Sequence, residues 1–489
     1  MVQFIPGWND WKWKRRSGEL VARCATYKRV LSEFLFMPVG QFFSEPIETM
    51  PRGDLDALID ERVRYTVKYA AEHSPFYRNW FRTNSIRPEE IRVHEDLLGL
   101  PVISGRTIRE HQPPVTTDFE FLSSAWGEVF SIQETSGTSG TPKSFFLTWE
   151  DWKRYAEKYA RSFVSQGFSE KDRIVVCASY GMNVGANTMT IAAQRIGMGI
   201  IPLGKCTFDL RVLKNYKPTA IVGSVFKLLR LFYRLRGEGV KPSDTSITRL
   251  VAGGESFADE SRAYLAERWG VPVYNTYGST EGTMCGECTQ LAGLHVPEDL
   301  VHLDVYDPHR QSFVKDGECG RGILTTLLPV GGKCGTLLLN YDTEDTTVVI
   351  SREPCRCGRT HMRIVNPQRE AETIWVGGNP FNRVDVEAAV FQSENMEYLT
   401  GEYEAFVYDG DQPNETVLRV SLECFVPDKC DRRLVQEHFI ARFLKHKQGL
   451  SALYHDGAFP IVFNFTGPGG LEFAKLRGRP KRLVDRRNP

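Results

Sequence analysis

The sequence predicts an α/β protein, in which a large N-terminal domain with mostly parallel sheets flanked by helices precedes a small α+β C-terminal domain. Three observations lead to this prediction. Between residues 173 and 274, short apolar runs alternate with helical patterns, which is typical of βαβ units around a parallel sheet. Residues 302–350 hold closely spaced β-rich runs, and both kinds of pattern resume from about Glu370. The expected domains are 1–369, with a β-rich part at about 300–369, and 370–489.

Composition narrows the class of protein. A chain of 489 residues is long enough for about three domain-sized units and a large core. Its 61 basic and 61 acidic residues give a formal charge of +0, so no charge excess favours nucleic acid or acidic lipid as a partner. No apolar run approaches the roughly 18 residues that span a bilayer, and the eleven cysteines are mostly scattered. We therefore expect a soluble cytoplasmic protein that binds neither nucleic acid nor membrane.

Helical spacing and its interruptions place the elements in order. Residues 54–73 carry apolar positions at i, i+3 and i+4, and Ser74-Pro75 ends that pattern. In the alternating region, the same criteria separate strands from helices. The expected strands are 173–178, 200–203, 219–222, 250–252 and 271–274, and the expected helices are 184–196, about 226–235 and about 259–269.

The remaining elements are β-rich at first and mixed afterwards. An antiparallel meander or small barrel is predicted by apolar runs at 303–305, 322–324, 337–339 and 348–350. The C-terminal domain is expected to contain strands at 373–376, near 404–408 and at 417–425, with helices from Val384 and from about Arg432 to Lys445. Its last segment, 475–487, is strongly basic, which fits either a solvated tail or a contact near a phosphate site.

A loop rich in glycine and hydroxyl residues, 136–143, is the strongest candidate for a ligand site. Glycines let backbone N–H groups face a ligand, hydroxyls add adjustable donors, and Lys143 adds a charge suited to phosphate oxygens. The G-x-x-x-x-G-K spacing of a Walker A loop is absent. The loop therefore predicts a polyphosphate site, with a solvated linker as the alternative. The residues concerned are Ser136, Gly137, Thr138, Ser139, Gly140 and Lys143.

Two expected strand ends carry glycine-flanked carboxylates, in Gly253-Gly254-Glu255-Ser256 and in Tyr277-Gly278-Ser279-Thr280-Glu281-Gly282. Because ligands bind beyond the carboxyl ends of parallel strands, we expect both segments to lie beside the phosphate loop. Tyr277 offers a flat face to a purine, or is a core aromatic. Glu281 offers an oxygen ligand for Mg²⁺, or is a helix-entry carboxylate. Asp345 could hold a ribose diol by accepting two O–H bonds.

Three cysteines and one histidine have spacings that suit a metal site. Cys288 and His295 lie seven positions apart, and Cys355-x-Cys357 follows about sixty residues later. Three sulfurs and one imidazole complete a tetrahedral set for structural Zn²⁺. Cys285 competes with Cys288 for this role, and unligated thiols are the alternative to a metal. A catalytic thiol is disfavoured, because no histidine is paired with a cysteine in an evident nucleophile–base motif.

In their order along the chain, these motifs resemble those of the adenylate-forming superfamily, which includes acyl-CoA synthetases, peptide-synthetase adenylation domains and luciferase. The matching runs are Ser136–Lys143, Gly253–Glu255, Tyr277–Glu281 and Tyr341-x-Thr-x-Asp345. Three further runs are similar to the phenylacetate–CoA ligase branch, namely Ser74–Tyr77, Gly293–Asp299 and Cys355–Thr360. The resemblance extends from roughly residue 60 to the C-terminus.

The resemblance implies a two-step reaction on a small carboxylic acid, which we expect to be aromatic. The carboxylate attacks the α-phosphorus of ATP and expels pyrophosphate, which gives an acyl adenylate. The small C-terminal domain then rotates, and the thiol of coenzyme A displaces AMP. The implied cofactors are ATP, Mg²⁺, coenzyme A and a structural Zn²⁺. Members of this branch often form homodimers.

The resemblance also implies a role for each motif. The loop residues, with Lys143, would hold the β- and γ-phosphates, Thr280 would contact the α-phosphate, and Glu281 would bind Mg²⁺. Tyr277 would stack on adenine or border the acid pocket, within the same run as Gly278 and Ser279 and opposite Gly254 and Glu255. Asp345 would hold the ribose, with a second ribose or phosphate contact from Arg363 or Arg369. Candidates for the lining of the acid pocket are Phe145 and Tyr180–Asn183.

The sequence departs from the family pattern at three places. Arg479 stands where the family has its catalytic lysine, and the nearest lysines are Lys475 and Lys481. Arginine keeps the charge but has a wider planar head, so either Arg479 or Lys481 acts with altered geometry or the first half-reaction differs. The family's Tyr-Arg-Thr is Tyr341-Asp342-Thr343 here, and the hinge region reads Glu370-Ala371-Glu372.

These departures leave two alternatives open. One is an adenylating enzyme that passes the acyl group or AMP to a carrier-protein thiol, an amine or another nucleophile. The other is a non-catalytic homologue that binds a nucleotide.

Overall fold

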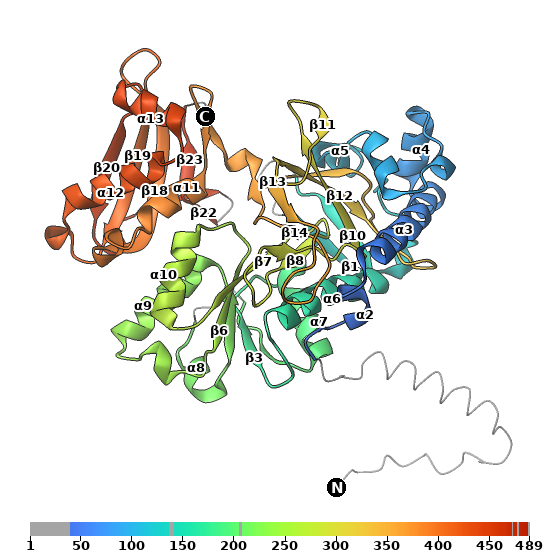
Figure 1. The fold of residues 1–489 in the computed structure, drawn as a ribbon, viewed down its shortest axis with the longest axis horizontal. Helices are drawn as coiled ribbons and strands as arrows, with labels where there is room; N and C mark the ends of the chain where they lie inside the picture. Colours follow the sequence, from blue (N-terminus) through green and yellow to red (C-terminus); the bar gives the residue numbers. More distant parts are fainter. Residues whose placement is uncertain (1–39, 136–140, 205–207, 472, 477–478, 488–489) are drawn as a thin grey trace, which may run out of the picture.

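The computed structural model describes residues 40–135, 141–204, 208–471, 473–476 and 479–487. In this part of the chain, the N-terminal helices lie on one side of a large sheet and the C-terminal elements on the other (Figure 1). Short 3₁₀ helices connect the main elements and span Pro88–Glu90, His94–Gly99, Trp126–Glu128, Pro242–Asp244, Glu370–Glu372, Asn395–Glu397 and Pro427–Lys429.

The N-terminal helices pack against the β-rich region. They are α2 (Glu45–Glu48), α3 (Arg52–His73), α4 (Pro75–Thr83) and α5 (Gly105–Glu110). The apolar stripe predicted within 54–73 is buried in one cluster with Leu303 and Leu324, which confirms both the helix and its packing face. α3 ends at Ser74, whose hydroxyl accepts from the N–H of Tyr77 and thereby begins α4.

A two-stranded hairpin carries the end of the candidate phosphate loop into a long helix. β1 (Val129–Glu134) pairs antiparallel with β2 (Ser144–Thr148), and α6 (Trp149–Ser165) follows at once. Thr148 caps α6 through a reciprocal pair of bonds with Asp151. α6 is buried along most of its length, so its polar side chains meet protein rather than water.

The predicted parallel sheet is confirmed. Its strands run in the order β4 (Gly199–Ile201), β3 (Arg173–Val176), β5 (Ala220–Gly223), β6 (Arg249–Gly253) and β7 (Val273–Gly278), all parallel. One face is covered by α6 and α7 (Val184–Ile196), and the other by α9 (Val225–Gly237) and α10 (Asp259–Trp269). The short helix α8 (Arg211–Tyr216) precedes β5.

Beyond β7 the same sheet continues with antiparallel strands, in the order β8, β9, β14, β13, β12, β10 and β11. Together with β15, which pairs with β13 at the side, the sheet has 13 strands in the described part of the chain. Their bounds are β8 (Met284–Gly286), β9 (Leu294–His295), β10 (Val301–Asp307), β11 (Ser312–Phe313), β12 (Cys319–Thr326), β13 (Tyr341–Ser351), β14 (Arg363–Ile364) and β15 (Gln368–Arg369), which pairs with β13. The meander is therefore confirmed, but the alternative of a closed barrel is wrong, because its strands extend the parallel sheet.

One strand of the predicted meander is also wrong. Leu337–Leu339 are buried but lie in an irregular segment. Part of their hydrogen bonding is to side chains, since the N–H groups of Leu338 and Leu339 donate to the hydroxyls of Thr326 and Tyr77. An apolar run this short is compatible with any buried segment, whatever its backbone conformation.

The C-terminal residues form their own four-stranded sheet, in the order β20, β19, β18 and β23. Its strands are β18 (Leu399–Asp409), β19 (Thr416–Cys424), β20 (Ile461–Thr466) and β23 (Leu483–Asp485). Two separate hairpins are formed by β16 (Ile374–Val376) with β17 (Asn379–Phe381) and by β21 (Ala474–Leu476) with β22 (Arg479–Lys481). The helices are α11 (Arg383–Val390), α12 (Arg432–Leu444) and α13 (Gln448–His455). The predicted boundary at 369/370 falls where β15 ends, and it stays a prediction.

A search of the described helices for a membrane-spanning segment finds none of sufficient length and apolar character.

Candidate active site

Lys143 lies at the centre of the candidate site. Its ammonium group is buried and donates to the Glu281 carboxylate at 2.7 Å and to the Tyr341 hydroxyl at 2.5 Å. The ends of the preceding loop are joined, because Thr135 and Lys143 exchange two hydrogen bonds. The loop residues Ser136, Gly137, Thr138, Ser139 and Gly140 lie outside the described residues. The C-terminal end of the loop therefore meets the segments around Glu281 and Tyr341.

The fold explains why these distant segments meet. Glu281 lies in the turn between β7, the last parallel strand, and β8. Tyr341 begins β13, and it is joined to the segment before α5 by a bridge between Ile103 and Tyr341. The turn that holds Glu281 follows the carboxyl end of β7, where ligands bind in parallel sheets, and Lys143 joins this turn to the start of β13.

Tyr277 and Asp345 are in direct contact. The Tyr277 hydroxyl donates to Oδ2 of Asp345, so the predicted base-binding and ribose-binding residues touch each other. Arg369 on β15 is the register partner of Asp345 on β13. Arg363 lies elsewhere, since it pairs with His295 and donates to the carbonyl of Ala292 at 3.2 Å. Of the two arginines predicted for this role, the geometry favours Arg369.

Burial and charge set the ionisation of the two carboxylates in opposite directions. Burial alone would raise the pKa of Glu281, but the Lys143 ammonium outweighs it and holds the pKa below its usual value. For Asp345, burial dominates and raises the pKa, although the Tyr277 hydroxyl and the charge of Arg369 oppose this. Glu281 is therefore an ionised oxygen donor, which suits a divalent cation.

The glycines at the two strand ends have different surroundings. Gly254 has a φ of +84°, and a Cβ placed there would meet no atom within 4 Å. Glu255 beside it is exposed. At Gly278, a Cβ would come within 2.6 Å of Met284 Sδ and 3.0 Å of the Tyr159 hydroxyl, so a larger residue would require Met284 to move. Ser279 donates its N–H to the Thr283 carbonyl at 2.8 Å and thereby closes the turn that holds Thr280.

The predicted residues of the acid pocket lie at the carboxyl end of β3 and on β2. Phe145 is buried among apolar side chains, while Met182 is 48 % exposed. The Tyr180 hydroxyl bonds the Thr190 hydroxyl at 3.1 Å, and Asn183 caps α7. Phe145 and Asn183 thus also have structural roles.

The C-terminal candidates lie on the short hairpin of β21 and β22. Lys481 Nζ lies 3.2 Å from the Glu372 carboxylate. Arg479 is the first residue of β22, and only its backbone is described. The Lys481 ammonium is thus paired with the segment that directly follows the predicted domain boundary.

Asp342, which stands where the family has a basic residue, is also paired. Arg321 on β12 donates to Asp342 at 2.9 Å and forms a second ion pair with Glu370. A basic group is therefore supplied beside Asp342 from the neighbouring strand. The same guanidinium joins β13 to the first residue after the predicted boundary.

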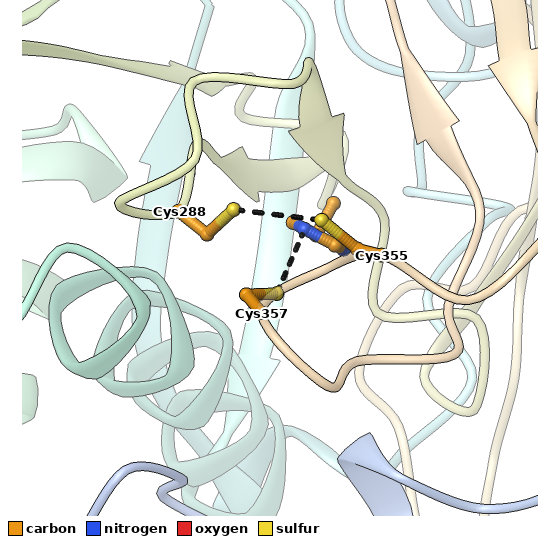
Figure 2. Close-up of side chains that lie close together, drawn as sticks. Cys288, Cys355 and Cys357 are labelled. Carbon is orange, nitrogen blue, oxygen red and sulfur yellow. Dashed lines mark hydrogen bonds between the residues drawn. The ribbon is translucent and has the colours of Figure 1, made fainter.

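The predicted metal ligands come together (Figure 2). Sγ of Cys288 lies 3.8 Å from Sγ of Cys355, and Sγ of Cys357 lies 3.6 Å from Nε2 of His295. A tetrahedral zinc ion with Zn–S of about 2.3 Å and Zn–N of about 2.0–2.1 Å requires separations of about 3.8 Å and about 3.5–3.6 Å. The donor set and its spacing therefore fit Zn²⁺.

The structure also decides between the two cysteines that competed for this cluster. Cys285 lies on β8 opposite Tyr277 and is buried in the apolar core with Leu294. Cys288 lies with Cys355 and Cys357. A hydrogen bond from Cys288 lowers the pKa of Cys357, which favours the thiolate form that binds metals.

Sequence reasoning missed several residues around the site. Gln112 clamps the exit of the loop, since its amide donates to the Pro142 carbonyl at 2.7 Å and accepts from the N–H of Ser144 at 3.1 Å. At Gly105, a Cβ would lie 3.1 Å from Lys143 Nζ, so a larger residue would crowd the ammonium. Both lie in a stretch without a recognisable motif.

Two residues on α6 were also missed. Tyr155 and Lys158 contact the turn that contains Glu281, and burial lowers the pKa of Lys158 to about 8. No signal pointed to Lys158, because the apolar residues of 149–165 lie on one side of a helical wheel and Lys158 lies on the other. The polar side of such an amphipathic helix is expected to face water, whereas Lys158 is buried in the structure.

Comparison with known proteins gives consistent matches. The family described as AMP-binding enzyme matches residues 89–323. The phenylacetate–coenzyme A ligase of Thermus thermophilus is 30% identical over 328 residues, which cover 66% of this chain and 72% of that protein. The enzyme of the same name from Aromatoleum evansii is 25% identical over 455 residues, covering 91% and 97%. A crystal structure of 2-hydroxyisobutyryl-CoA ligase in the postadenylation state, with 2-HIB-AMP, superposes with a TM-score of 0.76 at 21% identity, covering 93% of this chain and 94% of that one.

Proposed function

The chain belongs to the AMP-binding enzymes, in the branch of the phenylacetate–coenzyme A ligases, and from this premise we propose that it joins an aromatic carboxylic acid to the thiol of coenzyme A. In the first half-reaction, a carboxylate oxygen bonds to the α-phosphorus of ATP and the bond to pyrophosphate breaks. In the second, the thiol sulfur bonds to the acyl carbon, AMP leaves with the former carboxylate oxygen, and the thiol proton is released.

The observation that carries this proposal is the meeting of Lys143, Glu281 and Tyr341, next to the contact between Tyr277 and Asp345. A nucleoside triphosphate needs a cation near its phosphates, an oxygen ligand for its metal ion and a hydrogen-bond acceptor for its ribose hydroxyls. The five side chains supply these groups beside the carboxyl end of β7. Transfer of an adenylyl group depends mainly on such positioning and on neutralised charge.

Lys143 would contact the outer phosphates together with the loop that ends there, and Thr280 would face the α-phosphate. Glu281 is the residue that would hold Mg²⁺, and bound magnesium would neutralise charge on the phosphates. Asp345 would accept the ribose hydroxyls while Tyr277 faces the base or the acid. Arg369 would add the second ribose or phosphate contact.

The cation of the adenylation step would come from the hairpin of β21 and β22. Lys481 is our candidate, because its ammonium lies 3.2 Å from the Glu372 carboxylate and so stands beside the segment that directly follows the predicted boundary. Arg479 is the second candidate. Lys481→Ala and Arg479→Ala separate the two, since only the variant that lacks the acting cation should lose acid-dependent pyrophosphate release.

We also propose that the cluster of Cys288, His295, Cys355 and Cys357 holds a structural zinc ion. Zinc with four protein ligands leaves no open position, so the role is to hold the loop after β8 against the segment 355–357. The spacing of the four donors supports this role.

The experiment that tests the function is acid-dependent release of pyrophosphate, with a panel of aryl acids and with and without coenzyme A. A thioester product with coenzyme A is the expected result. Acid-dependent pyrophosphate without a coenzyme A product would instead favour transfer to a carrier-protein thiol, an amine or another nucleophile. ATP binding without release for any acid would favour a non-catalytic homologue and overturn the ligase proposal.

A further inference from the structure

One face of α6 is bonded to the main chain of the β7–β8 hairpin. Tyr155, Lys158, Ser162 and Ser165 lie at helical intervals and all point to the hairpin. Ser162 Oγ contacts the Thr276 hydroxyl at 3.3 Å, and Ser165 Oγ donates to a main-chain carbonyl beyond β8 at 2.8 Å. The helix therefore supports the hairpin along its length, and Tyr155 and Lys158 support its turn.

The two contacts at the turn enclose Glu281. The Tyr155 hydroxyl donates to the carbonyl of Thr280 at 3.2 Å, and Lys158 Nζ donates to the carbonyl of Gly282 at 2.7 Å. The peptide unit between Thr280 and Glu281 and the unit that follows Gly282 are thus each held by one side chain of α6. The direction in which the Glu281 carboxylate points depends on these peptide units.

The absence of a side chain at Gly282 lets Tyr155 and Lys158 approach the turn. The φ of Gly282 is +111°, which L side chains rarely adopt. A Cβ there would lie 2.9 Å from the Tyr155 hydroxyl and 3.8 Å from Lys158 Nζ. Glycine at this position therefore serves the close approach of α6 as well as the turn itself.

A buried lysine is unusual in a contact that only supports the fold. Lys158 is 5 % exposed, and the hydrogen bond of its ammonium is to a carbonyl rather than to a carboxylate. The Tyr155 ring lies 4.9 Å from the ammonium and provides a cation–π contact. Burial of an ammonium group costs free energy that a single neutral acceptor offsets only in part. A neutral donor or an apolar side chain would serve stability better, so the charge points to a functional role.

We propose that Lys158 and Tyr155 are positioning residues for adenylation, which hold the Thr280–Gly282 turn so that Thr280 and Glu281 face the phosphates and their metal ion. This inference rests on the proposed function of the same site. Because α6 begins directly after β2, the helix also couples the turn to Lys143 at the end of the loop. Misplacement of the turn lowers the rate even though the side chains that contact the nucleotide stay intact.

The test compares Lys158→Met, Lys158→Gln and Tyr155→Phe with Ser165→Ala, which removes a similar bond two turns further along the same face. The readouts are kcat for acid-dependent pyrophosphate release, the KM for the acid, and the Mg²⁺ concentration that gives half of the maximal rate. For Lys158→Met we expect a 10- to 100-fold lower kcat, a several-fold higher Mg²⁺ requirement and a KM for the acid within about threefold of the wild type.

Lys158→Gln retains a donor and is expected to fall between Lys158→Met and the wild type. Tyr155→Phe removes only a hydroxyl, so it keeps the proposal testable if Lys158→Met does not fold, and we expect a 3- to 10-fold lower kcat. Ser165→Ala should leave the Mg²⁺ requirement unchanged. Unchanged kcat and Mg²⁺ requirement in Lys158→Met and Tyr155→Phe would overturn the proposal, as would losses equal to that of Ser165→Ala.

Failure of the proposed function is a separate result. If the wild type releases no pyrophosphate with any acid, titration of ATP with and without Mg²⁺ decides the matter instead. The positioning role then predicts that Lys158→Met loses the enhancement of ATP binding by Mg²⁺, while Ser165→Ala keeps it. Equal enhancement in both variants would overturn the role of Lys158.

Discussion

The ammonium nitrogen of Lys143 lies 2.7 Å from Oε1 of Glu281, although 138 positions separate the two residues in the sequence. Both side chains are nearly buried, with 8% and 11% of their surface exposed. In the protein without nucleotide, each charge is therefore the partner of the other. Under the proposed function, bound ATP and its metal ion would give the ammonium phosphate oxygens and the carboxylate a cation. The ion pair would hold both side chains in place for the ligand.

We expect Glu281→Gln to lower magnesium-dependent pyrophosphate release by about 10²–10³-fold, because it removes a group that holds charge in the transition state. The variant also leaves the buried Lys143 ammonium without its carboxylate, which typically costs about 3–5 kcal/mol of stability. Pyrophosphate assays and thermal unfolding measure the two effects.

The double variant Lys143→Met/Glu281→Gln separates stability from catalysis. Its stability should return toward that of the wild type, because neither charge is left alone, while its activity should stay low. Full activity in Glu281→Ala would show that the catalytic assignment is wrong.

Tyr277→Phe tests the contact with Asp345. The variant keeps the ring but leaves the half-buried Asp345 carboxylate without the hydroxyl that donates to it, so it should raise the KM for ATP by about tenfold, which corresponds to roughly 1.4 kcal/mol. Steady-state kinetics with varied ATP measure this. Tyr65→Phe, which removes a hydroxyl bonded to the distant Gly332 carbonyl, should leave the KM unchanged. An equal effect of both changes would argue against a ribose site at Asp345.

Cys355→Ser should lower zinc content and thermal stability together, since the metal would link the loop after β8 to the segment 355–357. Atomic absorption and thermal unfolding measure the two quantities. The matched control is Cys319→Ser, because Cys319 is exposed and lies outside the cluster. Unchanged zinc content in Cys355→Ser would exclude the proposed site.

Asp299 provides a prediction for acid pH. Burial alone would raise its pKa, but the Arg161 guanidinium, at 2.6 Å, lowers the pKa to about 2. The carboxyl of an unfolded chain titrates near pH 3.9, so this pair stabilises the fold fully above about pH 4 and loses its effect as the pH falls toward 2. Arg161→Met should therefore cost about 3–5 kcal/mol near pH 7, and the gap to the wild type should narrow as the pH falls.

Denaturant unfolding at several pH values measures this gap. Arg310→Met is the control, because Arg310 is 67% exposed in its ion pairs and its loss should cost at most about 1 kcal/mol. A gap for Arg161→Met that is constant down to pH 3 would contradict the assigned ionisation.

Two helices of the parallel half were predictable to the residue because they have both a period and an end. The helices predicted at 184–196 and 259–269 agree with α7 and α10, and each is followed by a glycine in the left-handed region, Gly197 and Gly270. The strand predicted at 337–339 is wrong because burial alone does not determine strand pairing. Among the elements that were not predicted are α6, α8, α13 and β20.

The site was predictable where residue chemistry is unusual, as at Lys143, Glu281 and the cysteine cluster. Tyr155 and Lys158 were missed because a lysine in a helix is ordinarily solvated, and only the packing of α6 reverses that expectation. The choice of Arg369 over Arg363 was also beyond the sequence, since it depends on the register of β15 against β13.

The metal cluster and the proposed magnesium ligand occupy opposite ends of one hairpin. Glu281 lies in the turn of β7 and β8, and Cys288 follows two residues after β8 ends. We expect occupancy at one end to favour order at the other, and thermodynamic reciprocity would make this coupling equal in both directions. In competition with a chelator at equilibrium, the ATP-saturated protein should hold zinc more tightly, and zinc-depleted protein should bind ATP more weakly while it is still folded.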